Sequence, residues 1–148
     1  MKAEAKQRLL DAWRRLRGGE LTPARAGLSV AVGIAVGVLP LWGLHWFLVL
    51  AICLPLRLDA GVAYLASNVS LPFFAPFITS SEIAIGVRLL EGTWPQITPQ
   101  ALKETDLKTV LGALVLGTAV VAVTGATVIG GIVYGITSLV RSIRSRRA

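Results

Sequence analysis

The sequence predicts an all-α integral membrane protein. Of the 148 residues, 54% are hydrophobic and only 16% are charged, whereas an ordinary soluble domain has about 25% charged residues. The apolar residues form long runs between positions 26 and 140, and most charged residues stand before or after those runs. At about 20 apolar residues per crossing, the chain has room for one domain with only a few spans. A large cavity would therefore require a homo-oligomer, which we expect.

The formal net charge of +7 comes mainly from basic residues that flank the apolar part. They are Lys2, Lys6, Arg8, Arg14, Arg15, Arg17, Arg25, Arg141, Arg144, Arg146 and Arg147. Because cytoplasmic segments of membrane proteins are enriched in Lys and Arg, both termini are predicted to be cytoplasmic. In that position the basic residues favour anionic lipid headgroups as partners over nucleic acid.

Residues 1–20 are predicted to form an amphipathic surface helix. Leu9, Trp13 and Leu16 fall on one side at helical spacing, and charged residues occupy the other sides. Such a helix either lies on the membrane surface or packs against its own protein.

Residues 21–92 are predicted to form a membrane domain of two helical hairpins, each broken by proline. The first hairpin begins with Thr22 as a cap, followed by a proline at the first helical position. Its first helix is expected over Ala24–Leu39. Gly33 and Gly37 are spaced by four residues in this helix, which predicts close packing against another helix.

Pro40 and Gly43 form the first break. Proline interrupts the hydrogen-bond ladder of a helix, and glycine permits the chain to reverse. Leu44–Leu54 then continues as an apolar helix. The helices on either side of the break are short for a bilayer core of about 30 Å, so the sequence leaves open whether the hairpin crosses or re-enters the membrane.

The second hairpin is predicted from the apolar stretch at residues 60–66 and from a helix over Phe77–Leu90. Pro72 and Pro76 break the region between them. This break contains the polar residues Ser67, Asn68 and Ser70. Non-helical backbone at membrane depth is tolerated only where it is buried in protein or faces water. We therefore expect the two hairpins to face each other across a polar groove.

The last third of the chain is predicted to have three parts. Residues 93–108 form a polar linker, residues 109–140 a long Gly-rich transmembrane helix, and residues 141–148 a basic cytoplasmic tail. Gly131 and Gly135 repeat the spacing of four, which predicts packing against the rest of the chain or a second copy.

Glu82 and His45 are the two ionisable side chains that most need an explanation. A charge inside a membrane is unfavourable and usually faces protein or water, so Glu82 is expected to face Arg57, His45 or the region of Asn68. His45 has two interpretations, as a hydrogen-bonded or interfacial side chain between two tryptophans or as a proton-transfer group.

The residues that familiar enzyme chemistry requires are absent. There is no phosphate-binding glycine loop, no serine elbow and no paired carboxylates at catalytic spacing. The single histidine and the single cysteine, Cys53, make no metal-binding pattern. We therefore expect no catalytic residues, no metal and no cofactor, and we interpret Cys53 as an inert buried thiol.

A family resemblance is carried by four segments of residues 21–92. They are Thr22-Pro23, Ala31 to Pro40 (AVGIAVGVLP), Gly43-Leu44-His45 and Ala66 to Pro72 (ASNVSLP), together with Gly86. They resemble the bacterial membrane family known as domain of unknown function 2062. The resemblance implies a location in the bacterial inner membrane. Similar domains occur fused to glycosyltransferases, which implies work near lipid-linked or envelope precursors. In architecture only, the chain is also similar to DedA-type proteins with re-entrant hairpins.

Two functions fit these patterns. In the first, the protein is a carrier or translocase of lipids or lipid headgroups. Its polar groove would bind a headgroup through Ser67, Asn68, Ser70 and Arg57, and Glu82 or His45 would couple movement to protons. In the second, the protein is a scaffold without transport activity, whose breaks serve packing and whose basic surfaces recruit an envelope enzyme of glycosyltransferase type.

Overall fold

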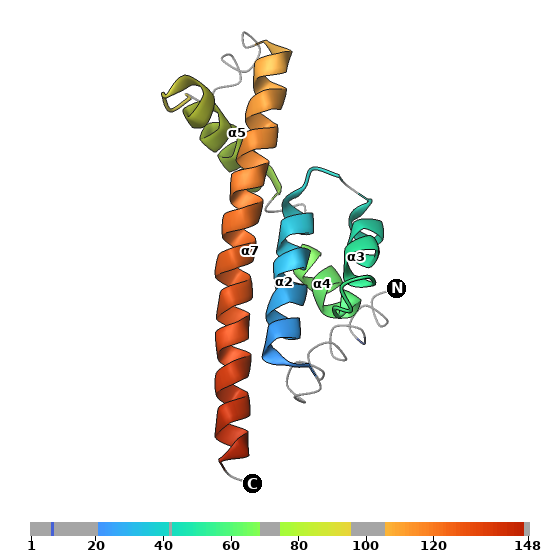
Figure 1. Cartoon of the computed structure of the whole chain (residues 1–148). Helices are drawn as coiled ribbons and strands as arrows, with labels where there is room; N and C mark the ends of the chain where they lie inside the picture. The colour runs from blue at the N-terminus through green and yellow to red at the C-terminus, as the bar shows by residue number, and fades with distance from the viewer. Residues whose placement is uncertain (1–6, 8–20, 42, 69–74, 96–105, 147–148) are drawn as a thin grey trace.

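The computed structural model describes residue 7 and residues 21–41, 43–68, 75–95 and 106–146. All regular structure in these ranges is helical, as predicted (Figure 1). The elements are α2 (Pro23–Val38), α3 (His45–Cys53), α4 (Ala60–Ser67), α5 (Ala75–Glu91) and α7 (Leu107–Ser145). Apart from residue 7, the predicted surface helix at residues 1–20 lies outside the described ranges. So do Ser70, Pro72, most of the linker and the last two residues.

The long helix α7 forms the spine of the molecule (Figure 1). It has 39 residues, which correspond to about 58 Å at about 1.5 Å per residue. Its length and hydropathy are sufficient to cross a membrane, and only 17% of its most apolar 18-residue window is buried. Large apolar side chains such as Val115, Val123 and Ile136 are exposed along it. A surface of this kind is typical of contact with lipid.

Helix α2 begins as its sequence predicts. The Thr22 hydroxyl accepts a hydrogen bond from the Arg25 amide at 3.3 Å, and Pro23 is the first helical residue. The helix ends at Val38, one residue before the predicted end. The chain then reverses at Gly43, whose φ of +87° is a conformation that glycine adopts without strain.

The connection from α3 to α4 is a compact capped turn. The Leu58 amide donates to the Cys53 carbonyl at 2.9 Å and the Arg57 amide to the Leu54 carbonyl at 3.2 Å, which is a Schellman motif. Arg57 takes the left-handed position with φ of 53°. Asp59 then caps α4 by accepting from the Val62 amide at 2.9 Å.

A hydrogen bond ties this turn to α2. The Asp59 amide donates to the hydroxyl of Ser29 at 2.9 Å, and Ser29 is fully buried. Cys53 is a free buried thiol, as predicted, and packs with Val36, Val49 and Ala63. Helices α2, α3 and α4 therefore share one small core.

Helix α5 begins at Ala75, two residues before the predicted start. Pro76 consequently lies in its first turn, where a proline needs no hydrogen-bond partner, and belongs to the helix instead of the break. In the last turn of α5, the Arg88 guanidinium lies 5.9 Å from the centre of the ring of Trp94, which follows the helix.

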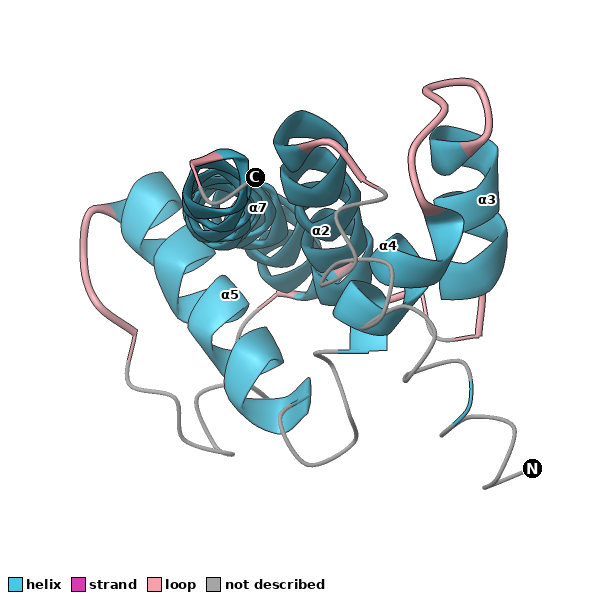
Figure 2. Ribbon diagram, turned by 90° about the horizontal axis from the view of Figure 1, so that it is seen from below, coloured by secondary structure: helices cyan, strands magenta, loops and turns pink. Residues whose placement is uncertain are grey.

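The helices form a row of neighbours instead of two facing hairpins. In Figure 2, α7 lies between α5 on one side and α2 on the other, and α4 and α3 follow beyond α2. Helix α4 packs against α2 and α3, and α5 packs against α7. The two helices of the second predicted hairpin thus have different partners, so our expectation of facing hairpins was wrong. The reason is that each of them packs against glycines of a different helix.

Candidate functional site

The crossing of α5 and α7 is the closest helix contact that surrounds an ionisable group. A side chain at Gly86 would overlap the backbone of Ala113, and one at Gly117 would overlap the backbone of Glu82. The two glycines allow the helix backbones to touch. Glu82 lies on α5 at this crossing, and only 1% of it is exposed.

Neither carboxyl oxygen of Glu82 has a hydrogen-bond partner within the described ranges. The hydroxyl of Thr118, on α7 beside Gly117, is also buried and makes no hydrogen bond there. The Thr118 hydroxyl nevertheless faces the Glu82 carboxyl closely enough to act on it as a weak donor, in a geometry that falls short of a formed hydrogen bond. Two unsatisfied polar side chains on facing helices are uncommon in a packed interior, which makes this pair the first candidate for a functional site.

The electrostatics of the site disfavour an ionised carboxylate. Burial removes water from the charge, and without a donor or a cation an ionised group is much less stable there than a neutral one. Glu82 can therefore bind one proton and remain in the closed crossing. Release of that proton requires water, a donor or a cation to reach the carboxylate.

His45 lies at the first break and not beside Glu82. Its Nε2 lies 3.1 Å from the carbonyl oxygen of Leu39, to which a protonated Nε2 donates. The Leu39 carbonyl also accepts from the Leu41 amide at 2.8 Å, so the histidine adds a second hydrogen bond at the end of α2 and links the two sides of the break. Helix α3, which begins with His45, packs against α2 and α4, whereas Glu82 packs against α7.

Of the predicted headgroup site, Ser70 lies outside the described ranges, and Arg57 is not brought together with Ser67 and Asn68. Ser67 and Asn68 both donate to the carbonyl of Tyr64, at 2.8 and 2.7 Å. Arg57 is exposed and precedes the N-terminal end of α4, whereas Ser67 and Asn68 are at its C-terminal end. The eight residues of α4 separate these ends by about 12 Å.

The predicted packing glycines fall into two groups. Gly33 and Gly37 contact α4, where side chains would overlap Ala63 and Ser67 respectively. Gly131 and Gly135 face open space among the described residues, none of which lies within 4 Å of a Cβ atom placed there. Within the chain, α7 uses the neighbouring Gly130 in its contact with α2.

Sequence reasoning missed Gly117, Ala113 and Thr118 as parts of the site. A usable signal was present on α7, because Ala113 and Gly117 are two small residues spaced four apart. Such pairs mark the faces where two helices approach closely. The described residues contain no group of three or more His, Cys, Asp or Glu side chains that could hold a metal.

Comparison with known proteins identifies the family. No curated protein and no solved structure matches the chain, so the similarity to DedA-type proteins stays an expectation. A family model described as "Uncharacterized protein conserved in bacteria (DUF2062)" matches residues 6–147. The match extends beyond the segments over residues 21–92 that carry the resemblance. Because it covers nearly the whole chain, this protein belongs to the bacterial family known as domain of unknown function 2062.

Proposed function

We propose that this protein is a proton-coupled carrier of lipids or lipid headgroups in the bacterial inner membrane, with both termini in the cytoplasm. Membrane insertion is supported by α7, whose length, hydropathy and exposed apolar side chains suit a lipid environment. The observation that carries the transport proposal is the buried carboxyl of Glu82 without a hydrogen-bond partner in the described ranges.

Proton binding at Glu82 would be linked to the geometry of the crossing. With the proton bound, the neutral carboxyl is compatible with the dry contact between α5 and α7. Without it, the carboxylate favours any arrangement in which water or a cation reaches it. A group whose charge state favours one of two helix arrangements is what coupling between protons and movement requires.

The experiment uses the full chain in proteoliposomes that contain a fluorescent phospholipid. Lipid movement between leaflets is followed by chemical quenching of the outer label, with and without an imposed pH gradient. We expect the wild-type protein to move lipid faster when the gradient is present. Glu82→Gln should stay folded and lose the response to the gradient, because glutamine is similar in shape and cannot exchange a proton.

Glu91→Gln is the matched control, because Glu91 ends the same helix and is exposed. It should respond to the gradient like the wild type. The proposal fails if the wild-type protein moves no lipid, or if Glu82→Gln keeps the full response.

The second candidate function is a scaffold that supports an envelope enzyme. It is favoured by the polar side chains at the breaks, since His45, Ser67 and Asn68 all hydrogen-bond to backbone carbonyls near the helix ends. Side chains engaged in this way serve packing. Replacing Asn68 by Ala removes one of these bonds and separates the two functions, since a scaffold should lose stability or enzyme binding, whereas a carrier coupled through Glu82 should keep its response to the gradient in the folded variant.

A further inference from the structure

A groove runs between α2 and α7, on the part of α7 that lies beyond the α5 crossing. Its volume is about 330 Å³, at the lower end of the range of about 300–1,000 Å³ for small-molecule sites. The lining residues are Ala24, Gly27, Leu28, Ala31, Ala126, Thr127, Gly130, Gly131 and Tyr134. Among the described residues, the groove is therefore almost entirely apolar and open along one side.

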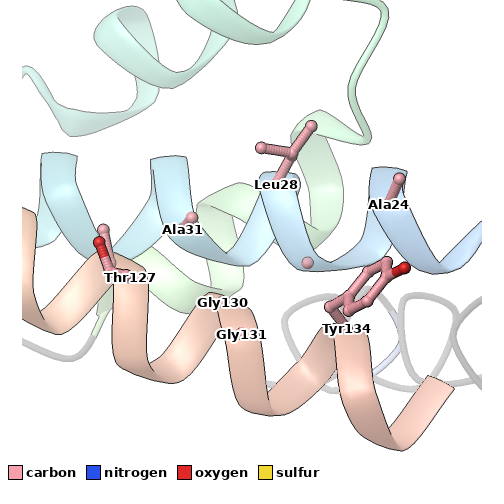
Figure 3. A pocket seen from close by; sticks show the side chains of 9 residues that line it. Ala24, Leu28, Ala31, Thr127, Gly130, Gly131 and Tyr134 are labelled. Atoms are coloured by element: carbon pink, nitrogen blue, oxygen red, sulfur yellow. The ribbon is translucent and has the colours of Figure 1, made fainter. Parts of the chain in front are cut away.

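Small residues create the groove. Gly27 and Gly130 bring the two helices together, since a side chain at Gly27 would lie 2.8 Å from the Gly130 carbonyl oxygen. Alanines and Gly131 beside this contact leave the space above it unfilled. In Figure 3 the ring of Tyr134 extends from α7 toward the first turn of α2, where Ala24 lies. The groove is thus narrow, with an aromatic side chain at one end.

Positive charge lies beyond that same end. Helices α2 and α7 are antiparallel, because Gly27 lies beside Gly130 and Ile34 lies beside Gly125. The first turn of α2, which contains the exposed Arg25, is consequently directed toward the basic end of α7. Arg141 is exposed and follows Tyr134 by seven residues, which places both on one face of the helix.

We propose that this groove holds one acyl chain of an anionic phospholipid, with the headgroup phosphate at Arg25 and Arg141. The apolar lining fits the chain, the arginines complement the phosphate, and Tyr134 is a residue type that prefers the headgroup level. A second copy fits less well, because a symmetric pair of chains would bring the like charges of their basic ends together. The site stands independently of the proposed transport.

The test uses the full-length protein in nanodiscs of phosphatidylcholine that contain a small fraction of phosphatidylglycerol with a photoactivatable acyl chain. After illumination, the covalent lipid adduct is measured and mapped by mass spectrometry. We expect the adduct to map to α2 and α7 at the groove. Unlabelled phosphatidylglycerol should compete at least fivefold better than phosphatidylcholine.

Gly131→Leu and Gly135→Leu form a matched pair of variants. A Cβ atom at either position meets no described atom within 4 Å, so both variants should fold, but only Gly131 lines the groove. We expect Gly131→Leu to lower the adduct at least fivefold and Gly135→Leu to stay within twofold of wild type. The double variant Arg25→Gln, Arg141→Gln should abolish the preference for phosphatidylglycerol.

Three outcomes would overturn the proposal. Equal adduct yields in both glycine variants would show that the label reports the general lipid surroundings. Equal competition by the two phospholipids would show that Arg25 and Arg141 do not select the headgroup. A loss of adduct in both variants together with a change from dimer to monomer would assign the groove to a second copy of the chain.

Discussion

The two halves of α7 use small residues in different ways. In the N-terminal half, Gly117 and Ala113 receive the backbone of α5, and the contact encloses two polar side chains. In the C-terminal half, Gly130 contacts α2 while the adjacent Gly131 faces open space and lines a groove. The same residue type thus closes one contact and leaves the other partly open. The comparison shows that the helix face on which each glycine lies, and not the number of glycines, decides which half of α7 has room for a ligand.

The largest expected effect comes from adding a methyl group where α5 and α7 touch, in the N-terminal half of α7. Gly117→Ala would place a methyl group against the backbone of Glu82, which side-chain rotation cannot relieve. We expect the free energy of unfolding to fall by about 3 kcal/mol, the upper end for overpacking. Thermal unfolding of the purified protein in detergent measures this.

Gly112→Ala is the control for that change. It lies in the same half of α7, where a side chain would make only an ordinary contact with Leu90 at 3.9 Å. It should not destabilise and should gain up to about 1 kcal/mol from helix propensity. Similar destabilisation by both variants would contradict the comparison between closed and open positions.

The second prediction concerns the buried carboxyl of the same crossing. Replacing Glu82 by Met removes two polar atoms without hydrogen-bond partners in the described ranges and keeps a side chain of similar volume. We expect the protein to be more stable by about 1–3 kcal/mol and to lose its response to a proton gradient. Glu91→Met, at the exposed end of α5, should stay within about 0.5 kcal/mol of wild type. A destabilised Glu82→Met variant would mean that the carboxyl has a structural partner.

The third prediction concerns the hydrogen bond that ties α2 to the turn before α4, away from the α5 crossing. Ser29→Ala removes the acceptor for the Asp59 amide, which leaves a partly buried donor without this bond. We expect a loss of about 1–2 kcal/mol, seen as a lower unfolding temperature. Lipid movement and its proton dependence should persist in the folded protein. Loss of proton dependence in the Ser29 variant would show that the two halves are coupled more tightly than their contacts indicate.

The smallest effects are expected at two adjacent glycines of the C-terminal half. Gly131→Ala points into open space and should stabilise by about 0.5–1 kcal/mol through helix propensity. Gly130→Ala would bring a methyl group to 2.8 Å from the Ala31 side chain and should destabilise by about 1 kcal/mol. Unfolding measurements on the two variants should therefore differ in sign, and equal signs would argue against the packing of α2 on α7.

Local patterns predicted the helix starts and ends well. Thr22 and Pro23 mark the start of α2 because capping and proline preference act within one turn. Gly43 marks the reversal because its backbone conformation is unfavourable for other residues. The apolar run after residue 109 predicted one long helix, which the structure shows with a few additional residues at each end.

The packing partners could not be predicted in the same way. The spacing of Gly131 and Gly135 is as regular as that of Gly33 and Gly37, yet only the second pair contacts another helix. A spacing of four identifies a face with small residues but not what lies opposite. The side chains of Ser67 and Asn68 were predicted to bind a ligand, but both donate to the backbone carbonyl of Tyr64. A sequence shows which side chains can donate but not which backbone carbonyls are left to accept.

If the protein inserts as proposed, the length of α7 has a consequence for the bilayer around it. Its uncharged residues 110–140 measure about 46 Å at about 1.5 Å per residue, whereas the hydrocarbon core is about 30 Å thick. In a bilayer, a tilt of about 40°, the upper end of what is observed, would reduce this only to about 35 Å along the membrane normal. The hydrophobic mismatch that remains favours thick membrane regions or local thickening of thin ones. In the proposed arrangement, bilayer thickness would therefore set how deeply the α5 crossing and the α2 groove are each immersed.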